Sequence, residues 1–134
     1  MRPINIIFSQ LALTTALVFG VQCAMAQSTP APAGSAVNGK ALYDTRCSAC
    51  HSVDAHRVGP MHQGVVGRKA GSSAGYRYSE ALRKSKIVWS HDTLVAWLAD
   101  PEALIPGQRM GYSMDNMQDR EDVVAYLATL KVGK

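Results

Sequence analysis

The chain has 134 residues, of which 14 are Lys or Arg and 10 are Asp or Glu, so its formal net charge is +4. This length is enough for one small domain, and the mild positive charge comes without a run of basic residues or interleaved aromatic residues. The composition therefore gives no indication of a nucleic-acid partner. The three cysteines are too few for a disulfide framework, because one of them lies in a predicted N-terminal signal segment.

Residues 1–26 have the pattern of a cleavable secretory signal peptide. Arg2 precedes an apolar stretch over 4–21, and small residues at 24–26 follow it as an A-x-A cleavage site. A retained membrane anchor is the alternative, but polar residues interrupt the apolar stretch. Residues 27–36, rich in Ser, Thr, Pro, Ala and Gly, are predicted to be a flexible leader.

A helical pattern begins near Val37, and Ser35 is a candidate cap for it. This helix leads directly into Cys47-Ser48-Ala49-Cys50-His51, which reads C-x-x-C-H, the attachment site of a c-type haem. Two thiols at this spacing lie on one face of a helical turn, close enough to bond the two vinyl groups of one porphyrin. The next residue points its imidazole at the iron, so His51 is the predicted proximal ligand. We therefore expect one haem c, bound covalently through Cys47 and Cys50.

Three other interpretations of the two cysteines compete with haem attachment. A zinc site needs two more ligands, and the remaining histidines are not in paired spacing. A thioredoxin-type C-x-x-C is expected beside a βαβ pattern, which the sequence does not contain. A structural disulfide between Cys47 and Cys50 would close too small a loop to add much stability.

The rest of the chain predicts short helices separated by loops. Residues 56–73 contain four glycines and are predicted to be a loop. A second loop holds Pro106-Gly107-Gln108-Arg109-Met110. No period-2 run of useful length appears, so we predict an all-α domain over 37–134 without a sheet. Further helices are expected over 79–84, 90–99, where Pro101 stops the helix, and 119–131.

The chain closely resembles the class I cytochromes c, especially mitochondrial cytochrome c and bacterial cytochrome c2. The resemblance implies the cytochrome c fold, in which short helices wrap around one covalently attached haem and the N- and C-terminal helices cross. In that fold Gly39 and Tyr43 of the first helix would meet Val123 and Tyr126 of the last. The matching segments, which span nearly all of 39–130, are Cys47–His51, Val58–Pro60, Gly67–Gly71, Gly75–Tyr78, Ile87–Trp89, Leu94–Pro101, Ile105–Met110 and Arg120–Leu127.

The resemblance also implies the second axial ligand of the iron. Met110 matches the family's distal ligand, and its thioether would complete a six-coordinate iron together with His51. Met110 follows Pro-Gly in a loop rather than lying on a helical apolar stripe, which also favours a ligand. The rival thioethers are those of Met61, Met114 and Met117.

Further haem contacts follow from the same resemblance. The Pro60 carbonyl would accept a hydrogen bond from the second imidazole nitrogen of the proximal ligand. A polar network of Arg68, Tyr78 and Trp89 would hold a haem propionate. Two other positions at the haem differ from the mitochondrial pattern: Trp97 stands where a Tyr is usual beside the Met ligand, and Gln108 where a Thr is usual.

These features predict a soluble periplasmic one-electron carrier rather than an enzyme. The haem iron would cycle between the ferric and ferrous states with both axial ligands retained, in a respiratory or related chain. Expected partners are redox proteins of the membrane or periplasm, and the carrier is expected to be a monomer without stable membrane insertion after signal cleavage. The alternatives are a dedicated cytochrome subunit of a larger oxidoreductase and a haem enzyme or sensor, which would need an open iron position.

Overall fold

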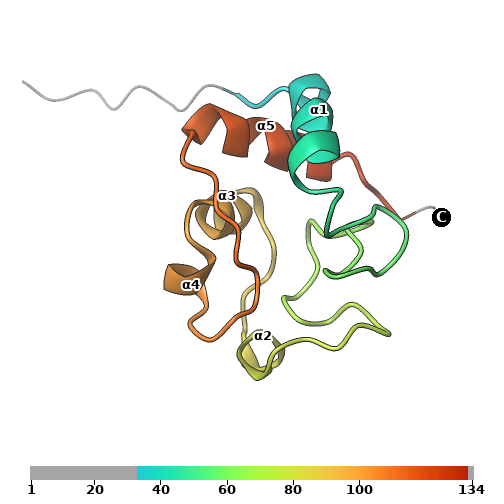
Figure 1. Ribbon diagram of the computed structural model, residues 1–134, viewed down its shortest axis with the longest axis vertical. Coiled ribbons are helices and arrows are strands. Elements are labelled where there is room, and N and C mark those ends of the chain that lie inside the picture. The colour runs from blue at the N-terminus through green and yellow to red at the C-terminus, as the bar shows by residue number, and fades with distance from the viewer. Residues whose placement is uncertain (1–32, 133–134) are drawn as a thin grey trace, which may run out of the picture.

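The structure is a computed structural model, and it describes residues 33–132. Loops join its helices, and no strand occurs in this part of the chain, where the β pairing is limited to an isolated bridge between Lys69 and Val88 (Figure 1). The predicted all-α class is therefore confirmed. The predicted signal peptide and residues 27–32 of the predicted leader lie outside the described residues. The helices are α1 (Ala36–Arg46), α2 (Glu80–Lys84), α3 (His91–Ala99), α4 (Pro101–Leu104) and α5 (Met117–Leu127).

Polar side chains cap the first amide groups of the helices. Ser35 accepts a hydrogen bond from the amide of Asn38, which confirms the predicted cap of α1. Ser79 caps α2 in the same way. Asn116 caps α5, so that helix begins two residues before the predicted position and ends at Leu127 rather than at residue 131. None of the helices described over 33–132 is both long and apolar enough to cross a bilayer.

The short helix α4 corrects the sequence prediction, in which Pro101 only ended the helix before it. The Asp100 carboxylate accepts hydrogen bonds from the amides of Glu102 and Ala103, at 3.1 and 3.0 Å. Pro101 occupies the first turn of α4, where its missing N–H would have had no intrahelical partner. The same proline therefore ends α3 and starts α4.

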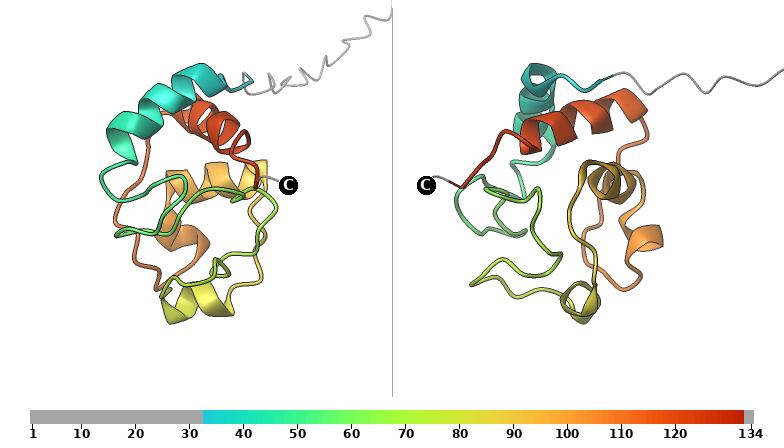
Figure 2. Two further views of the ribbon diagram at one scale, coloured as in Figure 1. Left: turned by 90° about the vertical axis from the view of Figure 1, so that its right-hand side faces the viewer. Right: turned by 180° about the vertical axis from the view of Figure 1, so that it is seen from behind.

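Helices α1 and α5 cross, as the resemblance implied, and Figures 1 and 2 show them side by side from three directions. The approach is close because Gly39 has no side chain: a Cβ there would lie 1.8 Å from the backbone oxygen of Asp122. Next to it, the rings of Tyr43 and Tyr126 pack with centroids 5.2 Å apart. The Ser35 amide donates to the Asp122 carboxylate at 2.7 Å, and this bond holds the pKa of Asp122 below its usual range.

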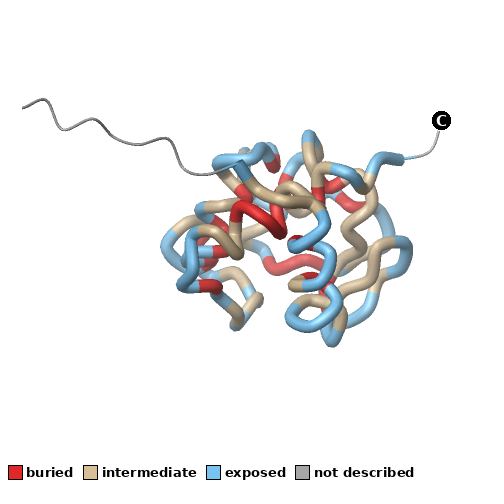
Figure 3. The backbone as a smooth tube through the Cα atoms, turned by 90° about the horizontal axis from the view of Figure 1, so that it is seen from above, coloured by how far each residue is buried: buried red, intermediate tan, exposed pale blue. Residues whose placement is uncertain are grey.

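The buried side chains gather where the crossing helices meet α3 and the loops. Figure 3 shows most of the buried stretches toward the inside of the molecule and most of the exposed ones at its outside. Two of the most deeply buried residues, Val123 and Val124, belong to α5. The core also draws on residues from the loops and from α3: Val65, Ala70, Trp89, Leu94, Trp97, Leu98, Ile105 and Met114.

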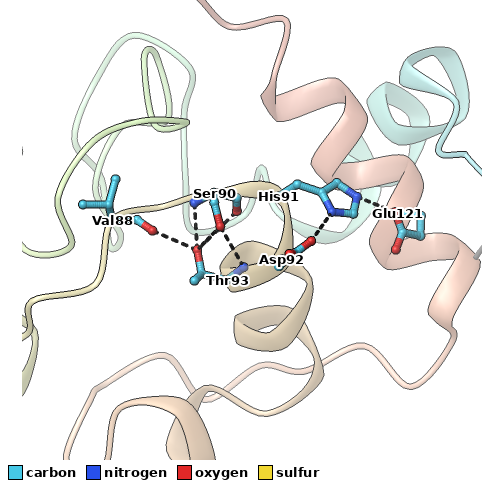
Figure 4. Close-up of polar contacts among 6 residues, drawn as sticks. All are labelled: Val88, Ser90, His91, Asp92, Thr93 and Glu121. Atoms are coloured by element: carbon cyan, nitrogen blue, oxygen red, sulfur yellow. Dashed lines mark hydrogen bonds and ion pairs between the residues drawn. The ribbon is translucent and has the colours of Figure 1, made fainter.

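A polar junction ties the start of α3 to α5 (Figure 4). Ser90 and Thr93 form a capping box that starts α3. The His91 ring then contacts two carboxylates: its Nδ1 lies 2.9 Å from Asp92 Oδ1, and its Nε2 lies 2.6 Å from Glu121 Oε2. Because Glu121 is only 5 % exposed, its carboxylate depends on this contact with the imidazole.

The His91 junction is expected to make stability depend on pH. The hydrogen bonds to Asp92 and then Glu121 raise the pKa of His91 above its ordinary 6.5. Because the pKa is raised in the folded state, the stabilisation by the charged His91 ring is complete below about pH 6.5. It is lost as the pH rises through the pKa of His91 in the folded protein. Since the His91 side chain is 56 % exposed, the charge contributes no more than about 1 kcal/mol.

Denaturant unfolding of wild type and His91→Leu at pH 5 and pH 9 measures this effect. The variant should be less stable by about 1 kcal/mol at pH 5, and the difference should shrink at pH 9. Asp92→Asn is the matched control, because Asp92 is 95 % exposed and its removal should cost less. A stability difference that is the same at both pH values would contradict a charged junction.

Candidate functional site

A cavity of about 820 Å³ lies within the fold. The segment that follows α1 and the segment between α4 and α5 run on opposite sides of the molecule in Figure 1, and both contribute to the cavity wall. Most of the lining is apolar, with a few polar groups, as in most cofactor sites. Among the predicted site residues, the cavity brings together Cys47, Cys50, His51, Pro60, Arg68, Tyr78, Trp89, Trp97 and Met110.

The two predicted attachment cysteines both line the cavity. Cys47 is the C-cap of α1, and its carbonyl accepts hydrogen bonds from the amides of Cys50 and His51, at 3.1 and 2.9 Å. This turn presents both thiols to the cavity, with Cys47 partly buried and Cys50 exposed. Burial raises the pKa of the Cys47 thiol to about 11. Both thiols are free, so the disulfide alternative does not apply to this structure.

The His51 imidazole is fixed from several sides. Its Nδ1 lies 2.8 Å from the Pro60 carbonyl oxygen, which accepts the ring N–H. This bond leaves the lone pair on Nε2 free to bind a metal. A Cβ on Gly59 would lie only 2.1 Å from the ring, so glycine permits the close approach. Burial lowers the pKa of His51 and so favours the neutral ring that a metal ligand requires.

The thioether of Met110 has an indole as its neighbour. The Trp97 Nε1–H donates to Met110 Sδ at 3.1 Å, and Trp97 in turn packs edge-to-face against Trp89 with centroids 5.2 Å apart. The Met110 amide donates to the Gln108 side-chain oxygen. Within the described residues, Met110 is the only methionine that lines the cavity.

The rival thioethers lie elsewhere. Met114 is 2 % exposed and belongs to the hydrophobic core, and Met117 is 47 % exposed and contacts Arg120. Neither of them lines the cavity, and nor does Met61. Their positions favour Met110 as the thioether that could reach a cofactor in the cavity.

Part of the cavity wall is polar. Arg68 lies there, and its guanidinium donates to the carbonyls of Gln63 and Met61 at 3.0 and 2.9 Å. Tyr78 and Trp89 line the same cavity and are 8 % and 7 % exposed. An arginine together with phenol and indole donors suits a carboxylate, such as the propionate of a haem.

The donor set fits a haem and does not fit the alternatives. An imidazole nitrogen, a thioether sulfur and two thiols line one largely apolar cavity, together with hydrogen-bond donors for carboxylates. Over 33–132, no group of three or more His, Cys, Asp or Glu side chains is placed to hold a metal ion, so a zinc site is not formed there. The same residues contain none of the strands that a thioredoxin-type βαβ unit needs.

Residues 36–131 match the family model described as "Cytochrome c". The chain belongs to the cytochrome c family. It is 46% identical over 104 residues to cytochrome c2 of Rhodopila globiformis, a match that covers 75% of this chain and 98% of that protein. It is also 40% identical over 98 residues to cytochrome c of Cochliobolus lunatus, covering 70% of this chain and 91% of that one.

A solved structure supports the same conclusion. Cytochrome cH from Methylobacterium extorquens aligns with a TM-score of 0.69 and 40% sequence identity, over 72% of this chain and 99% of that chain. The cytochrome c fold is thereby confirmed, together with the covalent haem c that this family binds through its cysteine pair. As a cytochrome c, the chain is a haem electron carrier and not an enzyme.

Two residues of this cytochrome c make contacts that the sequence alone did not indicate. Gln108 does not line the cavity; its side chain instead contacts the Met110 amide and Glu102. His62, considered above only as one of the histidines for a zinc site, lines the cavity beside His51. Burial, with smaller effects of His51 and Arg68, lowers the pKa of His62 to about 3, so the ring is neutral. In the sequence, only the position of His62 two residues after Pro60 indicated that it could lie near the proximal ligand.

Proposed function

We propose that this cytochrome c is an exported, periplasmic one-electron carrier whose haem iron is ligated by His51 and Met110. The observation that carries the proposal is the shared cavity: the His51 imidazole and the Met110 thioether line it together with both attachment cysteines. The signal pattern over residues 1–26 supports export. We further propose that residues 1–26 are removed, that 27–36 form a leader, and that 37–134 are the functional domain.

The protein's own groups would keep both ligands in place during electron transfer. When bound, the haem supplies an iron that gains or loses one electron. The Pro60 carbonyl and Gly59 hold His51, and the Trp97 indole holds Met110. Because each ligand is fixed before the electron arrives, little reorganisation is needed. A thioether ligand favours the ferrous form, and the largely apolar cavity disfavours the extra charge of the ferric form, so both raise the reduction potential.

The proposed partners are redox proteins of the membrane or periplasm that approach the exposed part of the cavity wall. Arg46 and Arg109 line the cavity and are exposed, so they offer positive charge to an acidic partner. The Glu102 carboxylate accepts hydrogen bonds from Gly107 and Gln108, which keeps a negative charge near this surface. The association rate with an acidic redox partner should therefore fall with added salt.

Expression of the full chain in a bacterium with a haem-attachment system tests the proposal. We expect a haem-stained band of mature size in the periplasmic fraction, and mass spectrometry should place the new N-terminus at Gln27. A redox titration should follow a one-electron curve, and the absorption spectrum should be that of a six-coordinate iron. An unprocessed, membrane-bound product would contradict export, and elution with a large partner would favour the alternative of a dedicated oxidoreductase subunit.

A further inference from the structure

A second histidine ring lies flat on the proposed proximal ligand. The centroids of the His51 and His62 rings are 4.2 Å apart, and the ring planes differ by only 19°. Stacking at this distance brings the face of one ring over the other, so the rings share a contact surface rather than a single atom. The His51 ring thus has three described neighbours: the Pro60 carbonyl at Nδ1, the backbone of Gly59, and the face of the His62 ring.

The His62 ring is itself anchored to the scaffold. Its Nδ1 lies 3.1 Å from the hydroxyl of Tyr43, which is 3 % exposed and belongs to α1. Its backbone amide donates to the Ser52 carbonyl at 3.1 Å, and its carbonyl accepts from the Val65 amide at 2.9 Å. Side chain and backbone are thus both fixed, so the stacked ring cannot turn away without breaking its hydrogen bond to Tyr43.

Each contact on His51 restrains a different motion. The bond to Pro60 fixes Nδ1, but a ring held at one atom can still tilt about that atom. A second ring stacked on its face opposes the tilt, because tilting would separate the two surfaces. The face of an aromatic ring also carries negative charge density, which attracts the positive charge that a ligand ring gains when its metal is oxidised.

We propose that His62 is a positioning residue for the proximal ligand, whose stacked ring sets the orientation of the His51 imidazole and stabilises the ferric state. This inference rests on the proposed ligation of the iron by His51. Tyr43 of α1 contributes to this positioning, because its hydroxyl holds the stacked His62 ring. His62 lines the cavity beside His51, and the positioning role belongs to its stacked contact with the His51 ring.

Three variants of the mature holoprotein distinguish the effect of the stacked His62 ring from the effect of its hydrogen bond to Tyr43. His62→Leu removes the aromatic face, so the ferric-to-ferrous ratio at a fixed potential should move toward the ferrous form by about three- to tenfold, tenfold being about 59 mV for one electron. His62→Phe keeps a face, and its ratio should stay within about twofold of wild type. Tyr43→Phe keeps the face but frees the ring, and should act mainly on the orientation of His51.

The orientation is measured on the ferric protein by nuclear magnetic resonance of the haem methyl groups. Their paramagnetic shifts follow the plane of the axial imidazole, so the order or spacing of these signals should change in His62→Leu and in Tyr43→Phe. A residue that only filled space would lower stability without changing either the potential or these shifts. His91→Leu is the matched control, because it removes an imidazole outside the cavity and should lower stability while leaving both readouts unchanged.

The outcomes that would overturn the inference are distinct from failure of the proposed function. If wild type shows histidine and methionine ligation while His62→Leu and Tyr43→Phe keep its potential and its methyl shifts, His62 has no positioning role. If His62→Leu does not fold, the two other variants decide. Unchanged methyl shifts in Tyr43→Phe, together with a more than twofold change of the ferric-to-ferrous ratio in His62→Phe, would also show that His62 has no positioning role. A wild-type spectrum without histidine ligation would overturn the proposed ligation itself.

Discussion

Replacing Met110 by leucine is expected to lower the reduction potential by roughly 0.1–0.3 V, a sizeable part of the range of about 0.8 V that axial ligands span. The substitution nearly conserves side-chain volume, so the cavity stays filled and the fold is retained. What it removes is the thioether that the Trp97 indole contacts at 3.1 Å, and with it the stabilisation of the ferrous form. The open position should also bind cyanide or azide faster than wild type does.

A redox titration followed by absorption, and ligand-binding kinetics on the ferric protein, measure both effects of Met110→Leu. Met114→Leu is the matched control, because Met114 is buried outside the cavity. Its potential and its rate of azide binding should equal those of wild type. The opposite pattern, with a wild-type potential in Met110→Leu and a lowered one in Met114→Leu, would assign the second axial ligand to Met114.

Replacing Gly39 by alanine is expected to destabilise the fold by about 3 kcal/mol or more, which is the upper end of the usual cost of overpacking. The new Cβ would lie 1.8 Å from the Asp122 carbonyl oxygen and 2.9 Å from the Tyr126 Cβ. Two of the three nearest atoms belong to the backbone of α5, so no side chain can rotate away and the helices must separate. Helix propensity acts in the opposite direction, since alanine in a helix is favoured over glycine by about 1 kcal/mol.

Ala41→Gly is the control, because it changes the helix propensity of α1 at an exposed position. Ala41 is exposed in α1, so this change should cost only the propensity difference of about 1 kcal/mol. Denaturant unfolding of both ferric variants gives the comparison. A Gly39→Ala protein more stable than wild type would mean that α1 and α5 do not approach as closely as described.

The sequence predicted those parts of the fold that depend on neighbouring residues. The cap at Ser35 and the turn of the cysteine motif are local, and the structure confirms the cap. Helix α4 was missed because Pro101 carries two meanings: it stops a helix that precedes it and suits the first turn of one that follows. The Asp100 side chain decides between them by capping the amides of the next turn.

The site was predicted less completely, because its finer contacts join segments that are distant in the sequence. The imidazole of His62 carries no motif, and its stacking on His51 depends on how the chain turns back after Pro60. Gln108 is expected at the haem by its position in the family pattern, and the structure adds that its side-chain amide contacts Met110 and Glu102. Spacing can indicate which residues are ligands, whereas the residues that hold the ligands are selected by three-dimensional packing.

The crossing of α1 and α5 also has a consequence for the order of events during folding. Ser35 and Asp122, which bond across it, are 87 residues apart in the sequence, so the pairing has a high contact order. Contacts within one segment form faster than contacts between distant segments, so α1 and the turn that carries the two thiols are expected to form before α5 packs against them. Until then α1 has no partner to pack against, and Cys47 is not held in its partly buried position. The late docking of α5 thus leaves the Cys47 thiol open until the crossing forms.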